Sequence, residues 1–200
     1  MKCWQEIYKN GKKVYLIEKT NDFEIEIPIF EQGTKQQKAN KPAIEDVCDY
    51  FLNDSILKEN TMRLLEFSRE LKMNPVWIQK NGFKCSYKGK SVISYKFGKD
   101  DIHICVYLAE KDDLHDVVLA LPDNLKTEFL KDRNLTHCQV CSAASCGFGV
   151  KVESSDKEYH FCSRFNYMCK NPTPEQFKMI EQFIGIRRNY IDSTKPENKK

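Results

Sequence analysis

Long apolar runs and a secretory leader are both missing from this sequence. No stretch approaches the ~18 apolar residues that a membrane-spanning helix requires. The first residues, Met1 to Glu6, carry charges and no apolar core of the kind found in a signal peptide. These absences predict a cytoplasmic protein with no membrane partner.

A dominance of one charge sign is missing as well. The chain has 32 basic and 29 acidic residues, and the net charge of +3 is spread along its length. A nucleic-acid-binding domain gathers basic residues on one face or arm, so this pattern gives no strong nucleic-acid signal. The composition, with 40% hydrophobic and 12% aromatic residues, is typical of a folded protein, and 200 residues suit one main domain.

Catalytic motifs are also lacking. The segment Lys88-Gly-Lys-Ser91 contains GKS, but it has no upstream glycine and joins two expected strands, so it predicts a hairpin turn. There is no GxSxG, no HExxH and no kinase motif set. The sequence therefore leaves open whether the protein is an enzyme.

What is present begins with strand patterns. Residues 1–31 are predicted to form an N-terminal β segment, a hairpin or meander, from short runs rich in β-branched and aromatic residues with turn chemistry at Asn10-Gly11. Residues 32–42 are polar and aperiodic, which predicts a linker or mobile loop.

Residues 43–191 are predicted to form the main domain. Apolar stripes indicate helices from Ile44 and from Leu57, and turn dipeptides then separate four strands between Val76 and Leu108. Two short helices, a strand pair and a terminal helix follow, the last opened by the capping sequence Thr173-Pro-Glu-Gln176. We expect Arg187 and Arg188 near the negative end of that helix dipole and a disordered tail over 192–200.

These elements predict an α+β fold: a curved antiparallel sheet flanked by helices, with an N-terminal β-hairpin or meander and a cysteine-rich C-terminal segment. From Trp77 onward the order of elements resembles the small uncharacterised bacterial α+β domains of the YdhG and YjbR type. The matching features are Pro75-Val-Trp77, Tyr87 to Tyr95, Leu121-Pro122 and a closing helix. The resemblance spans residues 44–191, implies a helix-flanked antiparallel sheet and brings no settled activity.

Nine cysteines are the chemically distinctive feature. Without a signal peptide, reduced thiols, metal ligands or redox cysteines are expected in place of structural disulfides. Thiolates favour zinc or iron, and Zn²⁺ takes four ligands in a tetrahedron. The predicted zinc ligands are Cys138, Cys141, Cys146 and Cys162, with Cys169, His160 and His137 as alternates.

Other interpretations of the cysteines stay open. The same four sulfurs suit an iron–sulfur cluster, Cys138 and Cys141 could form a redox dithiol, and the cysteines could also be reduced without an ion. Cys48, Cys85 and Cys105 lie among apolar residues, which predicts small buried side chains.

The functional hypothesis from sequence is a non-enzymatic module that binds a small molecule or protein partner on its sheet. A zinc site would fasten the C-terminal third. The candidate ligand-binding residues are Trp77, Tyr87, Tyr95 and Tyr107, although core positions suit these aromatics as well. The alternative is a thiol-based redox sensor or oxidoreductase that uses Cys138 and Cys141.

Overall fold

The structure is a computed structural model of the 200-residue chain. It describes residues 5–9, 12–16, 26–131, 149–154, 157–162 and 167–194. Within this part the protein is α+β, as the sequence predicted.

The N-terminal segment forms its own antiparallel sheet. Strands β1 (Gln5–Lys9), β2 (Lys12–Leu16) and β3 (Glu26–Ile27) follow one another in the order β1-β2-β3. The predicted meander is therefore confirmed in these residues.

The predicted linker contains a helix, α1 (Thr34–Ala39). Its Gln37 is fully buried, and the Gln37 Nε2 donates to the backbone carbonyl of Phe30 at 3.1 Å and to Asn81 Oδ1 at 2.7 Å. A polar residue stays buried when its amide finds partners of this kind. The aperiodic composition gave no hint of this packing.

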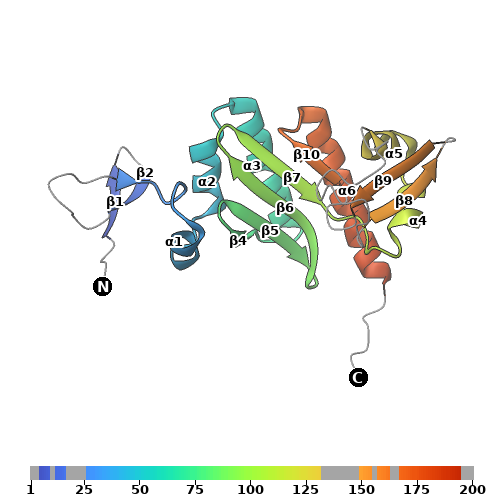
Figure 1. The fold of residues 1–200 in the computed structure, drawn as a ribbon, viewed down its shortest axis with the longest axis horizontal. Coiled ribbons are helices and arrows are strands. Elements are labelled where there is room, and N and C mark those ends of the chain that lie inside the picture. The colour runs from blue at the N-terminus through green and yellow to red at the C-terminus, as the bar shows by residue number, and fades with distance from the viewer. Residues whose placement is uncertain are drawn as a thin grey trace, which may run out of the picture.

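A five-stranded antiparallel sheet forms the centre of the molecule (Figure 1). Its order is β10-β7-β6-β5-β4, and its strands are β4 (Val76–Gln79), β5 (Gly82–Tyr87), β6 (Lys90–Gly98), β7 (Asp101–Val106) and β10 (Tyr167–Lys170). The first four were predicted. The edge strand β10 was not, although its Tyr167 lies opposite Val106 in register.

Each hairpin turn in the sheet contains at least one residue with positive φ. Lys88 and Gly89 both have positive φ (46° and 77°), as the type I′ turn of a two-residue hairpin requires. Asn81 and Asp100 occupy the left-handed region in the other two turns, with φ of 51° and 58°. Asn and Asp are the non-glycine residues that enter this region most readily.

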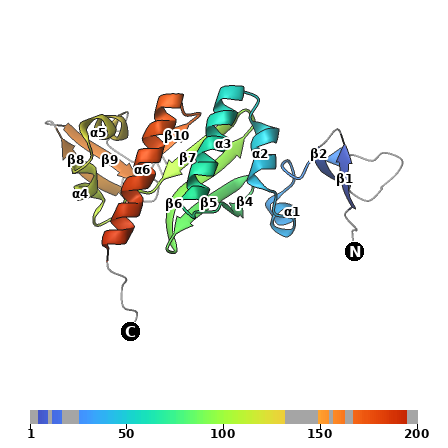
Figure 2. The same cartoon turned by 180° about the vertical axis from the view of Figure 1, so that it is seen from behind.

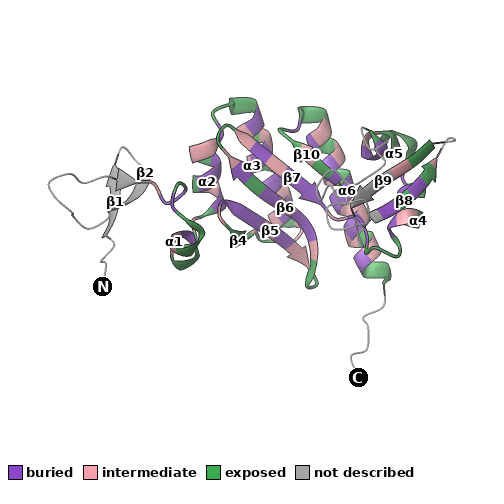
Figure 3. Ribbon diagram, viewed as in Figure 1, coloured by how far each residue is buried: buried purple, intermediate pink, exposed green. Residues whose placement is uncertain are grey.

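Three helices cover one face of this sheet: α2 (Ile44–Phe51), α3 (Ser55–Glu70) and α6 (Pro174–Ser193). Figure 2 shows α3 and α6 side by side in front of the strands. Their apolar stripes meet the inward side chains of β5, β6 and β7, and Figure 3 shows buried residues on both layers. This interface is the hydrophobic core.

Helix α6 begins with the predicted capping box. The Gln176 backbone N–H donates to Thr173 Oγ1, and the Thr173 N–H donates to Gln176 Oε1 at 3.0 Å. The helix continues through Ser193, two residues into the segment predicted as a disordered tail.

A smaller layer lies beside α6, on the side away from α3 (Figure 2). It contains α4 (Leu114–Leu119), α5 (Asp123–Leu130) and the hairpin of β8 (Gly149–Ser154) with β9 (Lys157–Cys162). Among the helices of the described ranges, none combines the length and apolar character needed to cross a bilayer.

Candidate functional site

The four aromatic residues predicted to bind a ligand are all at least partly buried. Tyr95 lies in the core with 1% of its surface exposed, and Trp77 and Tyr87 pack partly buried against that core. Tyr107 is half-buried and shares a hydrogen bond with Ser94, and burial raises the pKa of its hydroxyl. Tyr95, Trp77 and Tyr87 therefore contribute to the packing of the sheet.

The predicted metal ligands fall largely outside the described residues. This holds for Cys138, Cys141, Cys146 and His137, and for the side chains of Cys162 and His160 in β9. Of the side chains that the structure does describe, no three His, Cys, Asp or Glu residues gather as a metal site. The zinc site stays a prediction from the sequence.

The remaining alternate ligand, Cys169, is described. It lies half-buried in β10, where its Sγ is 3.9 Å from the carbonyl oxygen of Lys170. Burial raises the pKa of this thiol. Cys48, Cys85 and Cys105 are buried as predicted.

A pocket of about 520 Å³ opens at one end of the central sheet. We call it the hairpin-end pocket, because the β4–β5 and β6–β7 turns form two of its sides. Its volume lies within the range of about 300–1,000 Å³ that is usual for small-molecule sites. It is lined by Phe30, Glu31, Tyr50, Phe51, Asn53, Lys80, Asn81, Gly98, Lys99 and Asp100.

Hydrogen bonds join the walls of the hairpin-end pocket. The Asp100 N–H donates to the Phe51 carbonyl oxygen at 3.1 Å, which ties the β6–β7 turn to the end of α2. The Asn53 side-chain amide donates to Asp100 Oδ1. Lys80 Nζ donates to the Glu31 carbonyl oxygen at 3.2 Å, which ties the β4–β5 turn to the segment before α1.

Asn81 is held beneath the pocket by the buried amide of Gln37. Its N–H donates to Gln37 Oε1 at 2.8 Å, and its Nδ2 donates to the Phe30 carbonyl oxygen at 3.0 Å. The Trp77 indole N–H donates to the same Gln37 oxygen at 3.4 Å. A fully bonded polar network of this kind fixes side-chain positions, so the floor of the pocket is preorganised.

An aromatic wall forms one side of the pocket. The Phe30 and Tyr50 ring centroids are 4.8 Å apart, and those of Tyr50 and Phe51 are 5.0 Å apart with planes inclined at 85°. Phe30 is buried, whereas Tyr50 and Phe51 are partly exposed. Rings arranged in this way offer both faces and edges to a planar ligand.

Charged groups of both signs surround this wall. Lys80, Lys99, Glu31 and Asp100 line the same pocket, yet none of the four forms an ion pair with any side chain that the structure describes. The Glu31 carboxylate instead accepts from the Tyr50 hydroxyl; burial and this bond raise the Tyr50 pKa to about 12.

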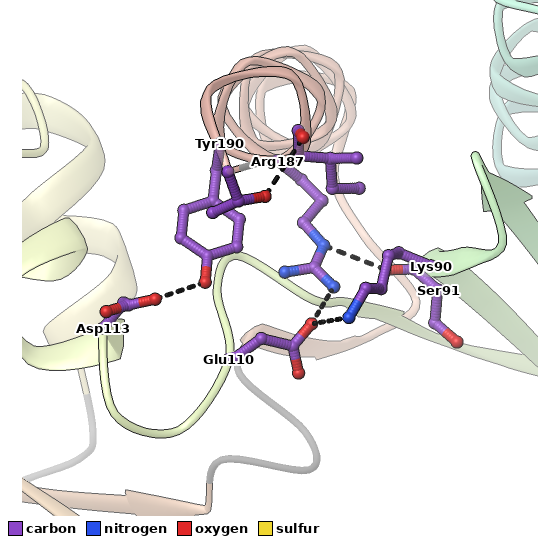
Figure 4. Close-up of polar contacts among 8 residues, drawn as sticks. Lys90, Ser91, Glu110, Asp113, Arg187 and Tyr190 are labelled. Carbon is purple, nitrogen blue, oxygen red and sulfur yellow. Dashed lines mark hydrogen bonds and ion pairs between the residues drawn. The ribbon is translucent and has the colours of Figure 1, made fainter. Parts of the chain in front are cut away.

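A second polar cluster lies where α6 meets the sheet (Figure 4). Arg187, which is only 3% exposed, donates from Nε to the Ser91 carbonyl oxygen at 3.0 Å and from Nη2 to Glu110 Oε1 at 2.9 Å. Its guanidinium carbon lies 5.3 Å from the centroid of the Tyr190 ring, and the Tyr190 hydroxyl donates to Asp113.

These contacts join α6 to β6 and to the loop that leads from the sheet to α4. The sequence placed Arg187 only near the negative end of the helix dipole and did not predict that its side chain is buried in these contacts. Its Nη1 has no hydrogen-bond partner within the described part of the chain. We interpret this cluster as a structural link between the two layers, because its strongest contacts are made by a buried side chain.

The pocket was not predicted from the sequence, because its lining comes from four separated segments. The two turns were predicted only as connections between strands, and the aromatic residues of the lining were not predicted as a site. One signal was available: two turns of an antiparallel meander that are separated by two strands lie at the same end of the sheet.

Comparisons of the chain with protein-family models, with curated proteins and with solved structures gave no match. The inference of function therefore depends on the geometry described above.

Proposed function

We propose that this protein is a non-enzymatic binding module whose ligand is a small, ring-bearing molecule held in the hairpin-end pocket. The observation that supports this most directly is the aromatic wall of Phe30, Tyr50 and Phe51 beside a preorganised floor. This retains the small-molecule hypothesis from the sequence and moves its location from the sheet to the end of two hairpins.

The energetics favour a ring. A planar ligand that covers Tyr50 and Phe51 would remove their partly exposed apolar surface from water, which contributes roughly 25 cal/mol for each Å². Aromatic contacts add about 0.5–1.5 kcal/mol for each pair beyond this burial. The described lining has no serine, cysteine or histidine, the residues that most often act as nucleophiles or proton carriers.

A titration of isotope-labelled protein with indole, a neutral ring, tests this proposal by NMR. We expect chemical-shift changes to concentrate at Glu31, Phe51, Asn81 and Lys99, and Phe51→Leu to weaken binding several-fold. The matched control is Phe67→Leu, which shortens a half-buried aromatic on α3 outside the pocket lining. Shifts centred elsewhere, or equal effects of the two variants, would show that the ring does not bind here.

A further inference from the structure

The hairpin-end pocket brings charges of both signs into one cavity. Some opposite charges elsewhere on the described surface pair, as in Lys58 with Asp49 at 2.5 Å and Lys170 with Asp101 at 2.8 Å. In the pocket, two ammonium groups and two carboxylates line one cavity without pairing with one another. Four charges that do not satisfy each other remain available to a ligand.

The hydrogen bonds of the pocket explain why these charges stay apart. The Asp100 carboxylate is held by the neutral amide of Asn53, and the Glu31 carboxylate by the neutral hydroxyl of Tyr50. Lys80 is held by a backbone carbonyl oxygen, and Lys99 has no partner within the described ranges. Neutral partners orient a charged group and leave its charge uncompensated.

We infer that the pocket binds an aromatic amino acid, a zwitterion whose ring lies on the Tyr50–Phe51 wall. Its carboxylate would meet Lys80 and Lys99, and its ammonium group would meet Glu31 and Asp100. Hydrogen bonds between charged groups are about twice as strong as neutral ones, so both ends of the ligand contribute. This inference rests on the proposed ring-binding function and adds the chemical class of the ligand.

Three probes that share the indole ring but differ in their charged groups separate the contributions of the carboxylate and the ammonium group to binding. L-Tryptophan carries both charges, indole-3-propionate only the carboxylate and tryptamine only the ammonium group. We expect L-tryptophan to bind at least about tenfold more tightly than either analogue, as the loss of one charge-assisted contact implies. Isothermal titration calorimetry on the whole chain measures the three affinities.

Two conservative substitutions test which residue of the pocket contacts each charged group of the ligand. Lys99→Gln should weaken the binding of L-tryptophan and indole-3-propionate and leave the affinity for tryptamine unchanged. Asp100→Asn should weaken the binding of L-tryptophan and tryptamine and leave the affinity for indole-3-propionate unchanged. The matched control is Lys178→Gln, which neutralises an exposed lysine on α6 and should affect none of the probes.

The outcomes separate this inference from the proposed function. Equal affinities for the three probes, with a loss on Phe51→Leu, would overturn the zwitterion inference and keep the ring site. Absence of binding by all three probes, or binding that Phe51→Leu does not change, would overturn both.

Discussion

Burial decides the chemistry of individual thiols in this protein. Cys48 and Cys85 have no exposed surface, and burial is the main cause that raises the pKa of each to about 12. Only the thiolate is a strong nucleophile or metal ligand. At about pH 8, a thiol with this pKa is ionised in on the order of one molecule in ten thousand.

The buried thiols and the predicted metal ligands should differ in their reaction with an alkylating agent. Mass spectrometry of the alkylated protein measures this difference. Cys48 and Cys85 should resist alkylation in the native protein whether or not a chelator is present, because they are buried and protonated. If the predicted zinc site exists, Cys138, Cys141, Cys146 and Cys162 should be protected until the metal is removed.

Denatured protein, in which every cysteine should react, is the control for this experiment. Zinc content measured on the same sample should be one ion per chain if four cysteines are the ligands. Chelator-independent labelling of these four residues, with no bound metal, would contradict the zinc hypothesis. A reversible Cys138–Cys141 disulfide under the same conditions would favour the redox alternative.

Helix α6 is the element on which both layers depend. It packs against α3, β6 and β7 on one side, and its Arg187 holds Ser91 and Glu110 at the start of the connection to α4. A charged hydrogen bond from a buried side chain contributes about 1.5–3 kcal/mol, whereas an exposed ion pair contributes at most about 1 kcal/mol.

We therefore expect Arg187→Ala to lower the free energy of unfolding by about 2 kcal/mol or more. Glu110→Ala should cost less than Arg187→Ala, because it removes only one of the two hydrogen bonds and the Glu110 side chain is 54% exposed. Chemical denaturation gives both values. Arg63→Ala, which removes a surface ion pair with Glu181, is the control; a loss for Arg187→Ala no larger than this control would show that the cluster is not a structural link.

The elements that were predicted from the sequence are those that depend on residues close together in the chain. The capping box of α6 and the Lys88-Gly89 turn need only a few neighbouring residues, and the stripes of α2 and α3 follow from periodicity. Each was confirmed at nearly the predicted residues.

The features that the sequence did not predict depend on partners far along the chain. Helix α1 is fixed by the bond between Gln37 and Asn81, which are 44 residues apart. Strand β10 has four residues and is defined by its pairing with β7. The hairpin-end pocket likewise needs the tertiary structure, because no single segment supplies both its rings and its charges.

At the scale of the whole molecule, several tyrosine hydroxyls and cysteine thiols are buried in their neutral form. Burial is the main cause that raises the pKa values of Tyr95 and Tyr167, and also those of Cys48, Cys85 and Tyr107. Since these folded-state values exceed the ordinary values of 9.0 for Cys and 10.0 for Tyr, the unfolded chain releases its protons first. The contribution of these neutral groups to the free energy of unfolding is fully present below the unfolded-state pKa values. It is lost as the pH rises above them.

The protein should therefore become progressively less stable above about pH 9, where unfolded thiols begin to ionise. Denaturant midpoints measured at increasing pH test this. Tyr95→Phe removes one fully buried hydroxyl. It should reduce the loss of unfolding free energy above about pH 10 by up to about 1.4 kcal/mol per pH unit. A midpoint that stays constant across this range, or the same slope in Tyr95→Phe, would contradict the prediction.

The position of α6 in the chain also bears on how the protein is made in the cell. The helix follows every strand that it covers, so the strands leave the ribosome before α6 is complete. Until then α2 and α3 are the only described helices that cover this face of the sheet, and the apolar side chains that pack against α6 are exposed to other nascent chains. Synthesis of this protein should therefore pass through a short period in which it depends on chaperones.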